Sequence, residues 1–241
     1  MKKLRCVVFD MEGTLFKKSY RLMKNKTFPS AWAVLCAKCK PKDLAVAEDA
    51  ANRERYSREE HIPGKYPYSQ WVIDTIKIHQ KYGMSRRQFY NVINSVEYFD
   101  GVTETFETLK EWGVTIAVIS GGLKALIDRV AVDHKIEHCF AAAEYFWNRD
   151  GTIKHWNVQP TDFVHKRTLL EILCHDLGVK PSECAFVGDG INDCDIARYC
   201  GMSIGFYPHK ALKEAATVTV DQDAGKEDLR AVLEHLKNFS R

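Results

Sequence analysis

The segment 7–15 constrains the fold more than any other part of this chain, because an apolar run ends there in two closely spaced acids. The β-branched and aromatic residues Val7–Phe9 predict a strand that is buried on both faces. Asp10 and Glu12 follow this run, and Gly13 permits a tight turn. Ligands bind at the carboxyl ends of strands in open parallel sheets, so we expect both acids at such an edge.

A second segment repeats this arrangement far along the chain. The apolar run Cys184–Val187 is followed by a glycine turn that contains Asp189, and Asp193 comes shortly afterwards. If both runs are strands of one sheet, Asp10, Glu12, Asp189 and Asp193 meet at one edge. Like charges at contact distance disfavour joint ionisation, so such a group requires a cation or a shared proton. Hard oxygen ligands without a nearby pair of histidines or cysteines indicate Mg2+.

The chain length and the net charge exclude several classes of protein. The 241 residues exceed a minimal domain but fall short of two large ones, which favours one sizeable core with an appendage. The net charge of +3 is small and the charged residues are mixed, which argues against nucleic acid as a partner. No segment is typical of a membrane span or a signal peptide, so we expect a cytoplasmic protein without a membrane partner. The oligomeric state stays open.

The eight cysteines lie mostly inside apolar segments rather than at regular spacing in loops. We expect them to be reduced and to behave as buried small hydrophobic residues. Cys36 and Cys39 form a CxxC pair, but no second pair stands at zinc-finger distance. We therefore interpret these two residues as thiols on a helix.

Helical periodicity replaces strand patterns after the first strand. Apolar residues recur at helix-like spacing over 71–96, and Gly83 predicts a break between two helices. We interpret residues 17–97 as a helical cap domain inserted after the first strand. Residues 1–16 and 98–241 are then the two parts of the core.

Strands and helices alternate in the rest of the chain. The patterns predict a helix over Val102–Trp112, a strand over Val114–Ile119, a hairpin turn over 148–152, and a helix over Lys166–Leu177 that Gly178 ends. This alternation predicts an α/β fold with a doubly wound, mostly parallel sheet covered by helices.

The end of the predicted strand carries a candidate anion site. Ser120 ends the strand and the pair Gly121–Gly122 is expected to open a helix. A hydroxyl and backbone N–H groups in that position can hold a phosphate. Lys166 begins a helix, where a cation gains nothing from the helix dipole, and taken alone it is typical of a solvated surface residue.

Four segments together resemble the ordered motifs of the haloacid dehalogenase (HAD) superfamily of phosphohydrolases. The segments are 10–14, 120–122, Lys166 and 188–193. They resemble most closely the phosphoserine phosphatase branch, in which the GDGxND form of the last motif is typical. The match covers residues 4–15 and about 98–205, while the helical insertion matches only in position and kind. The resemblance implies a Rossmann-like core and a magnesium-dependent phosphatase that acts on a small phosphorylated metabolite.

The resemblance also implies roles for the acids. Asp10 is expected to attack phosphorus and to form an aspartyl-phosphate. Glu12 is expected to protonate the leaving oxygen and then to take a proton from the attacking water. Asp10, the backbone carbonyl of Glu12 and the side chain of Asp189 are expected to bind Mg2+.

The remaining motif residues are expected to support this chemistry. Ser120 and the amide of Gly121 would bind phosphoryl oxygens, and Lys166 would neutralise the charge shared by the nucleophile and the phosphate. Asn192 and Asp193 would lie behind them, with Asp193 orienting the lysine or a metal-bound water.

The sequence departs from the family pattern at Glu12, where the second acid is usually Asp. Metal binding through the backbone carbonyl should survive the change, while the longer carboxyl must reach the leaving oxygen from a different rotamer. Some phosphatase and phosphotransferase relatives carry the same Asp-x-Glu. Two alternatives therefore stay open: a phosphotransferase that passes the phosphoryl group to an acceptor alcohol, and a regulator that binds phosphate or metal without turnover.

The substrate is expected to differ from phosphoserine. Phosphoserine phosphatases place an acidic residue early in the cap to meet the amino group of serine, but residues 13–42 contain no acid and Ser19 stands at that position. Three basic residues suggest a second anionic group on the substrate, with a solvated helix face as the alternative. These are Lys17, Lys18 and Arg21. The arginines within 53–58 alternate with glutamates and are interpreted as ion pairs on a helix surface.

Overall fold

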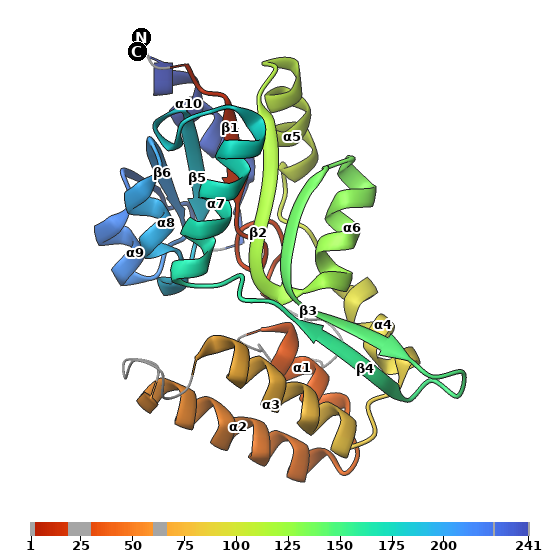
Figure 1. Cartoon of the computed structure of the whole chain (residues 1–241). Helices are drawn as coiled ribbons and strands as arrows, with labels where there is room; N and C mark the ends of the chain where they lie inside the picture. The colour runs from red at the N-terminus through yellow and green to blue at the C-terminus, as the bar shows by residue number, and fades with distance from the viewer. Residues whose placement is uncertain (1–2, 19–29, 60–66, 224, 241) are drawn as a thin grey trace.

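A sheet of seven strands forms the centre of the computed structural model, which describes residues 3–18, 30–59, 67–223 and 225–240 (Figure 1). The strand order is β4-β3-β2-β1-β5-β6-β7, and all neighbouring strands are parallel except β3 and β4. The strands are β1 (Cys6–Phe9), β2 (Thr115–Leu123), β3 (His138–Trp147), β4 (Ile153–Val158), β5 (Cys184–Gly188), β6 (Met202–Phe206) and β7 (Val218–Val220). The predicted doubly wound, mostly parallel α/β fold is confirmed.

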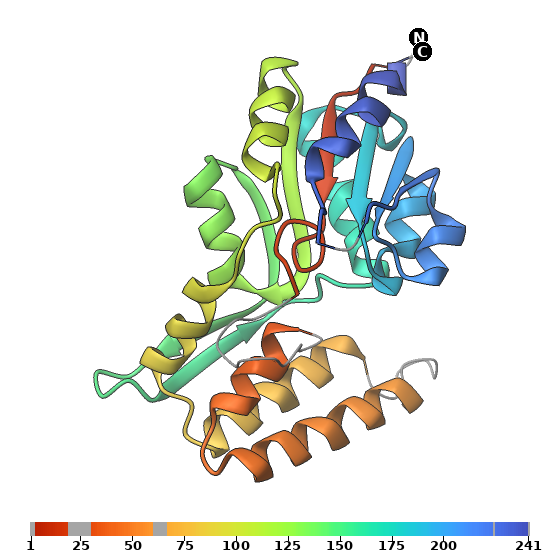
Figure 2. The ribbon, with the colours of Figure 1, turned by 180° about the vertical axis from the view of Figure 1, so that it is seen from behind.

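Helices cover both faces of this sheet (Figure 2). The alternating side chains of β1 pack against both layers. Val7 and Phe9 pack with apolar residues of α5, α6 and α10, whereas Cys6 and Val8 pack with those of α7, α8 and α9. All four β1 side chains are buried, which explains the continuous apolar run. The helices are α5 (Val102–Glu111), α6 (Lys124–His134), α7 (Val164–Leu177), α8 (Cys194–Tyr199), α9 (Lys210–Ala215) and α10 (Val232–Lys237). Short 3₁₀ helices also occur: η1 (Pro181–Glu183), η2 (Ile191–Asp193), η3 (Leu229–Ala231) and η4 (Asn238–Ser240).

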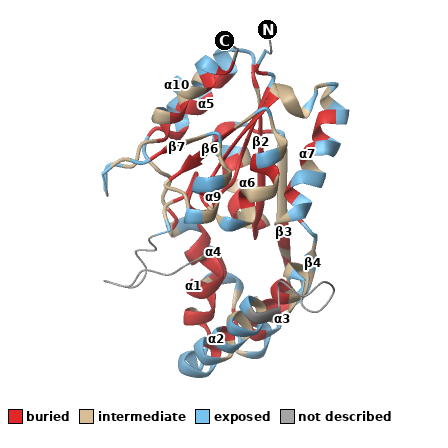
Figure 3. Cartoon of the chain, turned by 90° about the vertical axis from the view of Figure 1, so that its left-hand side faces the viewer, coloured by how far each residue is buried: buried red, intermediate tan, exposed pale blue. Residues whose placement is uncertain are grey.

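A helical segment follows β1, as the sequence predicted, and is called the helical insertion below. It contains α1 (Ala31–Lys38), α2 (Lys42–Glu59), α3 (Tyr68–Lys81) and α4 (Arg86–Ser95). The first three helices lie side by side below the sheet in Figure 1, and α1 is buried along nearly its whole length (Figure 3). Gly83 has a φ of +66° between α3 and α4, so the predicted break is confirmed. Among the described helices, none is both long and apolar enough to cross a lipid bilayer.

The antiparallel strands β3 and β4 extend towards the helical insertion (Figure 1). The amide of Asn148 donates a hydrogen bond to the carbonyl of Thr152 at 2.9 Å, and this tight turn confirms the predicted hairpin. Helix α3 packs against both strands of the hairpin. The hairpin therefore joins the helical insertion to the sheet.

Two predicted boundaries differ from the structure by two residues or more. The prediction that a helix opens at the glycine pair after Ser120 is wrong, because β2 continues to Leu123 and α6 begins at Lys124. The glycines keep this segment extended and close to its neighbours: a Cβ on Gly121 would lie 2.3 Å from a carboxylate oxygen of Asp162. Helix α7 also begins at residue 164, slightly before the predicted start.

Buried polar groups fix the helical insertion to the hairpin. The Sγ of Cys36 in α1 lies 3.1 Å from Nε2 of His79 in α3, and Nδ1 of that ring lies 2.8 Å from the Tyr145 hydroxyl in β3. Burial lowers the pKa of His79 to about 3, so the ring is neutral at neutral pH. Burial also raises the pKa of the Cys36 thiol, which is therefore protonated here.

Mild acid should destabilise the protein through His79. The pKa of its ring falls from 6.5 to about 3 on folding, so the unfolded chain takes up a proton first as the pH drops below 6.5. Between pH 7 and pH 5 this removes about 2 kcal/mol from the free energy of unfolding. Urea denaturation of the wild type and of His79→Gln at both pH values isolates this contribution, and an equal loss in the two proteins would contradict it.

Candidate active site

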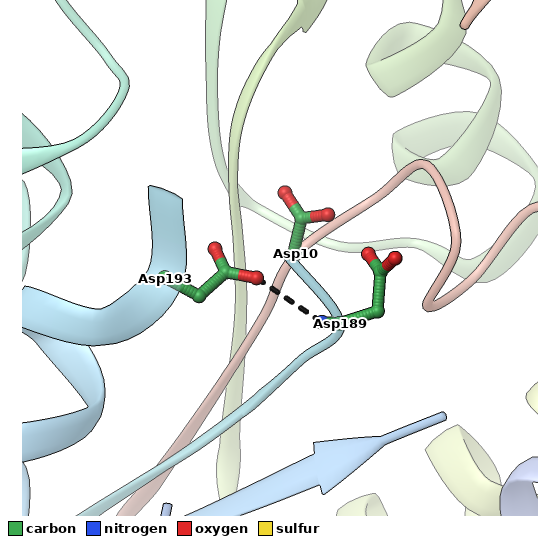
Figure 4. A group of neighbouring side chains, drawn as sticks. All are labelled: Asp10, Asp189 and Asp193. Atoms are coloured by element: carbon green, nitrogen blue, oxygen red, sulfur yellow. Dashed lines mark hydrogen bonds between the residues drawn. The ribbon is translucent and has the colours of Figure 1, made fainter. Parts of the chain in front are cut away.

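Three of the four predicted carboxylates meet at the carboxyl edge of the sheet (Figure 4). Asp10 follows β1, Asp189 follows β5, and Asp193 ends η2. Each offers an oxygen that lies within 4.8 Å of the others, and all three residues are buried. The parallel register places Phe9 opposite Val187, and the amide of Asp10 donates to the carbonyl of Val187 at 2.9 Å. The two strands therefore end at the same level.

The carboxylate of Glu12 does not join this group. Its Oε1 accepts a hydrogen bond of 2.7 Å from the backbone amide of Ala31, at the start of α1. The side chain nevertheless lines the same cleft as the aspartates. The extra methylene of Glu therefore lets this acid reach the helical insertion while it remains beside the site.

A fully buried lysine balances the charge of the aspartates. Lys166 reaches from α7, and its Nζ lies 2.7 Å from Oδ1 of Asp10 and 2.5 Å from Oδ1 of Asp193. Asp162 Oδ1 is 3.7 Å away. Burial opposes the charged form, but the three carboxylates outweigh it and raise the pKa of Lys166, so the ammonium keeps its proton. The residue is therefore not the surface lysine that its position alone suggested.

The carboxylate of Asp193 is held from both sides. Its Oδ2 accepts hydrogen bonds from the amides of Asp189 and Gly190, at 3.1 and 2.9 Å, while Oδ1 faces Lys166. A Cβ on Gly188 would lie 2.5 Å from Oδ2, which explains the glycine. Both oxygens of Asp193 are therefore engaged, and it orients the lysine and the turn after β5.

The two lysines after the first motif are paired with acids. Lys18 forms an ion pair with Asp189, and this carboxylate raises the pKa of Lys18 against the opposing effect of burial. Lys17 contacts Asp100 at 3.4 Å, outside the cleft. The idea that both lysines contact a second anion of the substrate is therefore wrong for Lys17. Arg21 lies outside the described residues.

The donor set fits a divalent cation. Asp10 and Asp189 present buried carboxylate oxygens near one another, and hard cations prefer oxygen ligands. Burial raises the pKa of Asp189 to about 6, against the effect of Lys18, so this carboxylate gains from a cation at neutral pH. Asp193 is a poorer ligand because its oxygens already accept hydrogen bonds.

The phosphate-binding candidates lie at the end of β2. Ser120 and Gly121 line the same cleft as Asp10. The carbonyl of Ser120 accepts a hydrogen bond of 2.6 Å from Thr161, and the carbonyl of Gly121 accepts one of 2.5 Å from the Tyr68 hydroxyl. These bonds fix the segment beside the aspartates, and the Ser120 hydroxyl also accepts a hydrogen bond of 3.1 Å from the amide of Gly122.

Sequence reasoning missed several residues that shape the site. Asp162 accepts a hydrogen bond of 2.7 Å from the side chain of Asn192 and lies four residues before Lys166, just ahead of α7. That spacing of an acid and a lysine was the available signal. Thr161 and Tyr68 carried no signal, because their contacts depend on how distant segments pack.

Arg53 forms an ion pair on its own helix, as interpreted, but with an aspartate one turn earlier, and it also lines the cleft. Arg53 lines the cleft from α2, and its Nε donates to Oδ2 of Asp49 at 2.8 Å. Its guanidinium also lies 5.6 Å from the ring centre of Trp71. The side chain of Arg58 lies outside the described residues.

One cleft of about 490 Å³ joins the carboxylates to the helical insertion. This volume suits a small molecule. The aspartates and the end of β2 form one part of its lining, and residues of α1, α2 and α3 form another. The lining residues from these helices are Trp32, Arg53, Tyr56, Ser57, Tyr68 and Trp71.

Known proteins resemble this chain in both sequence and fold. The family model of the haloacid dehalogenase-like hydrolases matches residues 4–201, so the chain belongs to this family of hydrolases. It is similar to the phosphoserine phosphatase of Methanocaldococcus jannaschii, with 22% identity over 98% of this chain and 99% of the relative. The phosphoserine phosphatase of Lactococcus lactis subsp. lactis is 31% identical over 66% of this chain and 71% of the relative.

Solved structures of phosphoserine phosphatases share the fold. An analogue of the phospho-aspartyl intermediate of phosphoserine phosphatase gives a TM-score of 0.73 at 21% identity, covering 97% of this chain and 99% of the other. A substrate-bound phosphoserine phosphatase gives 0.72 at 21% identity, covering 98% and 99%. The protein is thus a phosphoserine phosphatase-like hydrolase of the haloacid dehalogenase family, as the sequence motifs predicted.

Removing the buried cation should destabilise the fold. We expect Lys166→Met to lower the free energy of unfolding by about 3–5 kcal/mol, because the buried carboxylates lose their partner. Urea denaturation at pH 7 measures this loss of stability, and EDTA ensures that no metal ion takes the place of the missing ammonium. Lys124→Met is a matched control, since its pair with Asp128 is exposed and should be worth less than about 1 kcal/mol. Equal stability of Lys166→Met and wild type would contradict the assignment.

Proposed function

We propose that the protein is a magnesium-dependent phosphatase that hydrolyses a small phosphorylated metabolite through an aspartyl-phosphate. The observation that carries this proposal is the position of Asp10, which lies in the cleft beside Lys166 and Asp189. A buried ammonium at 2.7 Å fixes one carboxylate oxygen and balances its charge. The other oxygen can then approach a phosphoryl group bound by Ser120 and Gly121.

The proposed reaction has two steps. In the first, an oxygen of Asp10 forms a bond to phosphorus, the ester P–O bond breaks, and Glu12 gives its proton to the leaving oxygen. In the second, Glu12 takes a proton from water as that water attacks phosphorus, and the bond between Asp10 and phosphorus breaks. Lys166, the Ser120 hydroxyl and the amide of Gly121 stabilise the negative charge in both steps.

The metal proposed for this site is Mg2+. We assign its protein ligands to a carboxylate oxygen of Asp10, the backbone carbonyl of Glu12 and the side chain of Asp189. When bound, the ion would polarise the phosphoryl group and offset negative charge. Asn192 and Asp193 would support this site indirectly, through Asp162 and Lys166 respectively.

We propose that residues 17–97 act as a cap domain over a core of 1–16 and 98–241. Two contacts support this division: Glu12 bonds to the start of α1, and the Tyr68 hydroxyl bonds to Gly121. Both join the helical insertion to segments that carry the chemistry. Such a cap excludes water before the first step and admits it for the second.

The proposed substrate carries a second anionic group. Arg53 supplies a cation on the cleft wall, held in place by Asp49. The relatives are phosphoserine phosphatases, yet this chain has no acid within 13–42 to meet an ammonium group. Ser19, at the position where such an acid is expected, lies outside the described residues.

A direct assay tests the function. Purified protein should release phosphate from p-nitrophenyl phosphate with Mg2+, and EDTA should stop the release. Adding acceptor alcohols and searching for transferred phosphate distinguishes a phosphatase from a phosphotransferase, because both share the first step. Absence of magnesium-dependent release would instead favour a regulator without turnover.

Asp10→Asn should abolish turnover while the protein stays folded. The amide keeps an oxygen that can accept from Lys166 but is a poor nucleophile, so kcat should fall more than about a thousandfold. Phosphate release and the circular dichroism spectrum are the two measurements. Activity near wild type in this variant would refute Asp10 as the nucleophile.

Glu12→Gln should lower kcat by about 10²–10⁴-fold for alkyl phosphates, because the amide cannot exchange a proton. Its oxygen can still accept from Ala31, so the contact with α1 is kept. The loss in single-turnover cleavage should be smaller for p-nitrophenyl phosphate, whose leaving group departs without a proton. An equal loss for both esters would show that Glu12 does not protonate the leaving oxygen.

A further inference from the structure

One part of the cleft is formed by aromatic rings. Tyr56 of α2, Tyr68 of α3 and Phe163 before α7 have ring centres 6.0–6.3 Å apart, and all three line the cleft. We call these three residues the aromatic wall. Trp71 packs beside it, 5.9 Å from Tyr56 and 5.3 Å from Tyr68. The wall thus combines two segments of the helical insertion with one of the core.

The three rings of the aromatic wall do more than fill the space between the helical insertion and the core. Trp71 and Trp32 also line the cleft, but they are only 6% and 2% exposed and pack against one another beside the wall. The three wall residues remain partly exposed on the cleft side. Partly exposed rings in a concave site offer flat apolar surface to a ligand.

The backbone at Phe163 supports a role in binding. Its φ is +50° with ψ −127°, a region that L-residues rarely adopt, and Asp162 lies directly before it. Strained residues of this kind cluster at ligand clamps, where the surrounding structure holds them in place. Here the strain puts a ring opposite Tyr56 and Tyr68, next to the acid that contacts Lys166.

The charged residues of the cleft are distributed unevenly between its two parts. Its carboxylates, Asp10, Glu12, Asp162 and Asp189, belong to the reacting end. Among the described lining residues, the helices of the insertion contribute no acid to the cleft. The cations that line it are Arg53 and Lys18, and Lys18 is paired with Asp189. Asp162 beside the wall already bonds to Asn192 and lies 3.7 Å from Lys166, whereas a flat ring on the leaving alcohol would find apolar contact at the wall.

We propose that the aromatic wall binds an aromatic leaving group, so that the substrate is the phosphate monoester of an alcohol that carries a ring. This inference rests on the proposed phosphatase function. The Tyr68 hydroxyl bonds to Gly121 at the end of β2, so the wall begins where the phosphoryl group is held. A ring joined to the ester oxygen through one carbon would reach it.

Two esters of similar intrinsic reactivity test the proposal. Benzyl phosphate and ethyl phosphate have leaving alcohols of similar acidity, so a difference in kcat/KM reports on binding of the ring. We expect benzyl phosphate to be preferred by about tenfold or more, and L-phosphoserine to be a poorer substrate than benzyl phosphate.

Variants at Phe163 separate binding from folding. Phe163→Gly should fold, because glycine adopts the positive φ readily, but the preference for benzyl over ethyl phosphate should fall about five- to tenfold. Phe163→Tyr keeps a ring and should retain the preference. Lys135→Gly is the matched control: it also has a positive φ, of 52°, but lies outside the cleft at the end of α6, so the preference should not change.

The outcomes distinguish this inference from the proposed function. Hydrolysis of benzyl and ethyl phosphate with equal kcat/KM, or better turnover of phosphoserine, would overturn the aromatic subsite and leave a phosphatase. An unchanged preference in a folded Phe163→Gly protein would do the same. Failure to hydrolyse any of these esters in the presence of Mg2+ would overturn both proposals.

Discussion

The ammonium of Lys166 is the interaction on which the rest of the site depends. It is fully buried and lies within 4 Å of carboxylate oxygens from Asp10, Asp162 and Asp193. Without a cation there, three buried acids from three segments could not ionise together. With the lysine present, each carboxylate is held in one orientation. The buried negative charges, which would otherwise oppose folding, then form a fixed electrostatic environment for phosphoryl chemistry.

The sheet makes this interaction possible. β1 lies between β2 and β5 in the sheet. The chain adds β2, β3 and β4 on one side of β1 and then crosses to add β5, β6 and β7 on the other side. Such a change of direction opens a crevice at the carboxyl ends of the strands. Asp10, Ser120 and Asp189 come from the ends of these three strands, and Lys166 enters from the helix that precedes β5. Residues far apart in the sequence therefore share one cleft.

The core of the site could be predicted from sequence because its residues follow strands. An apolar run that ends in an acid predicts where that acid lies, and the structure has Asp10 and Asp189 together at the predicted edge of the sheet. Tyr68, Phe163 and Arg53 could not be found in this way. Tyr68 and Arg53 reach the cleft because of how the helical insertion packs over the sheet, and Phe163 because of the backbone conformation before α7. Sequence periodicity predicts an amphipathic helix but does not identify the surface against which it packs.

The helical insertion is bound to the same segments that carry the proposed chemistry. Glu12 bonds to the amide of Ala31, and Tyr68 bonds to the carbonyl of Gly121. A motion that lifts α1 and α3 must break both bonds, so opening would free Glu12 and loosen the end of β2 together. An acid one methylene shorter would reach less far towards α1. The Glu at this position therefore connects the position of the helical insertion to the proton transfer that we propose for this residue.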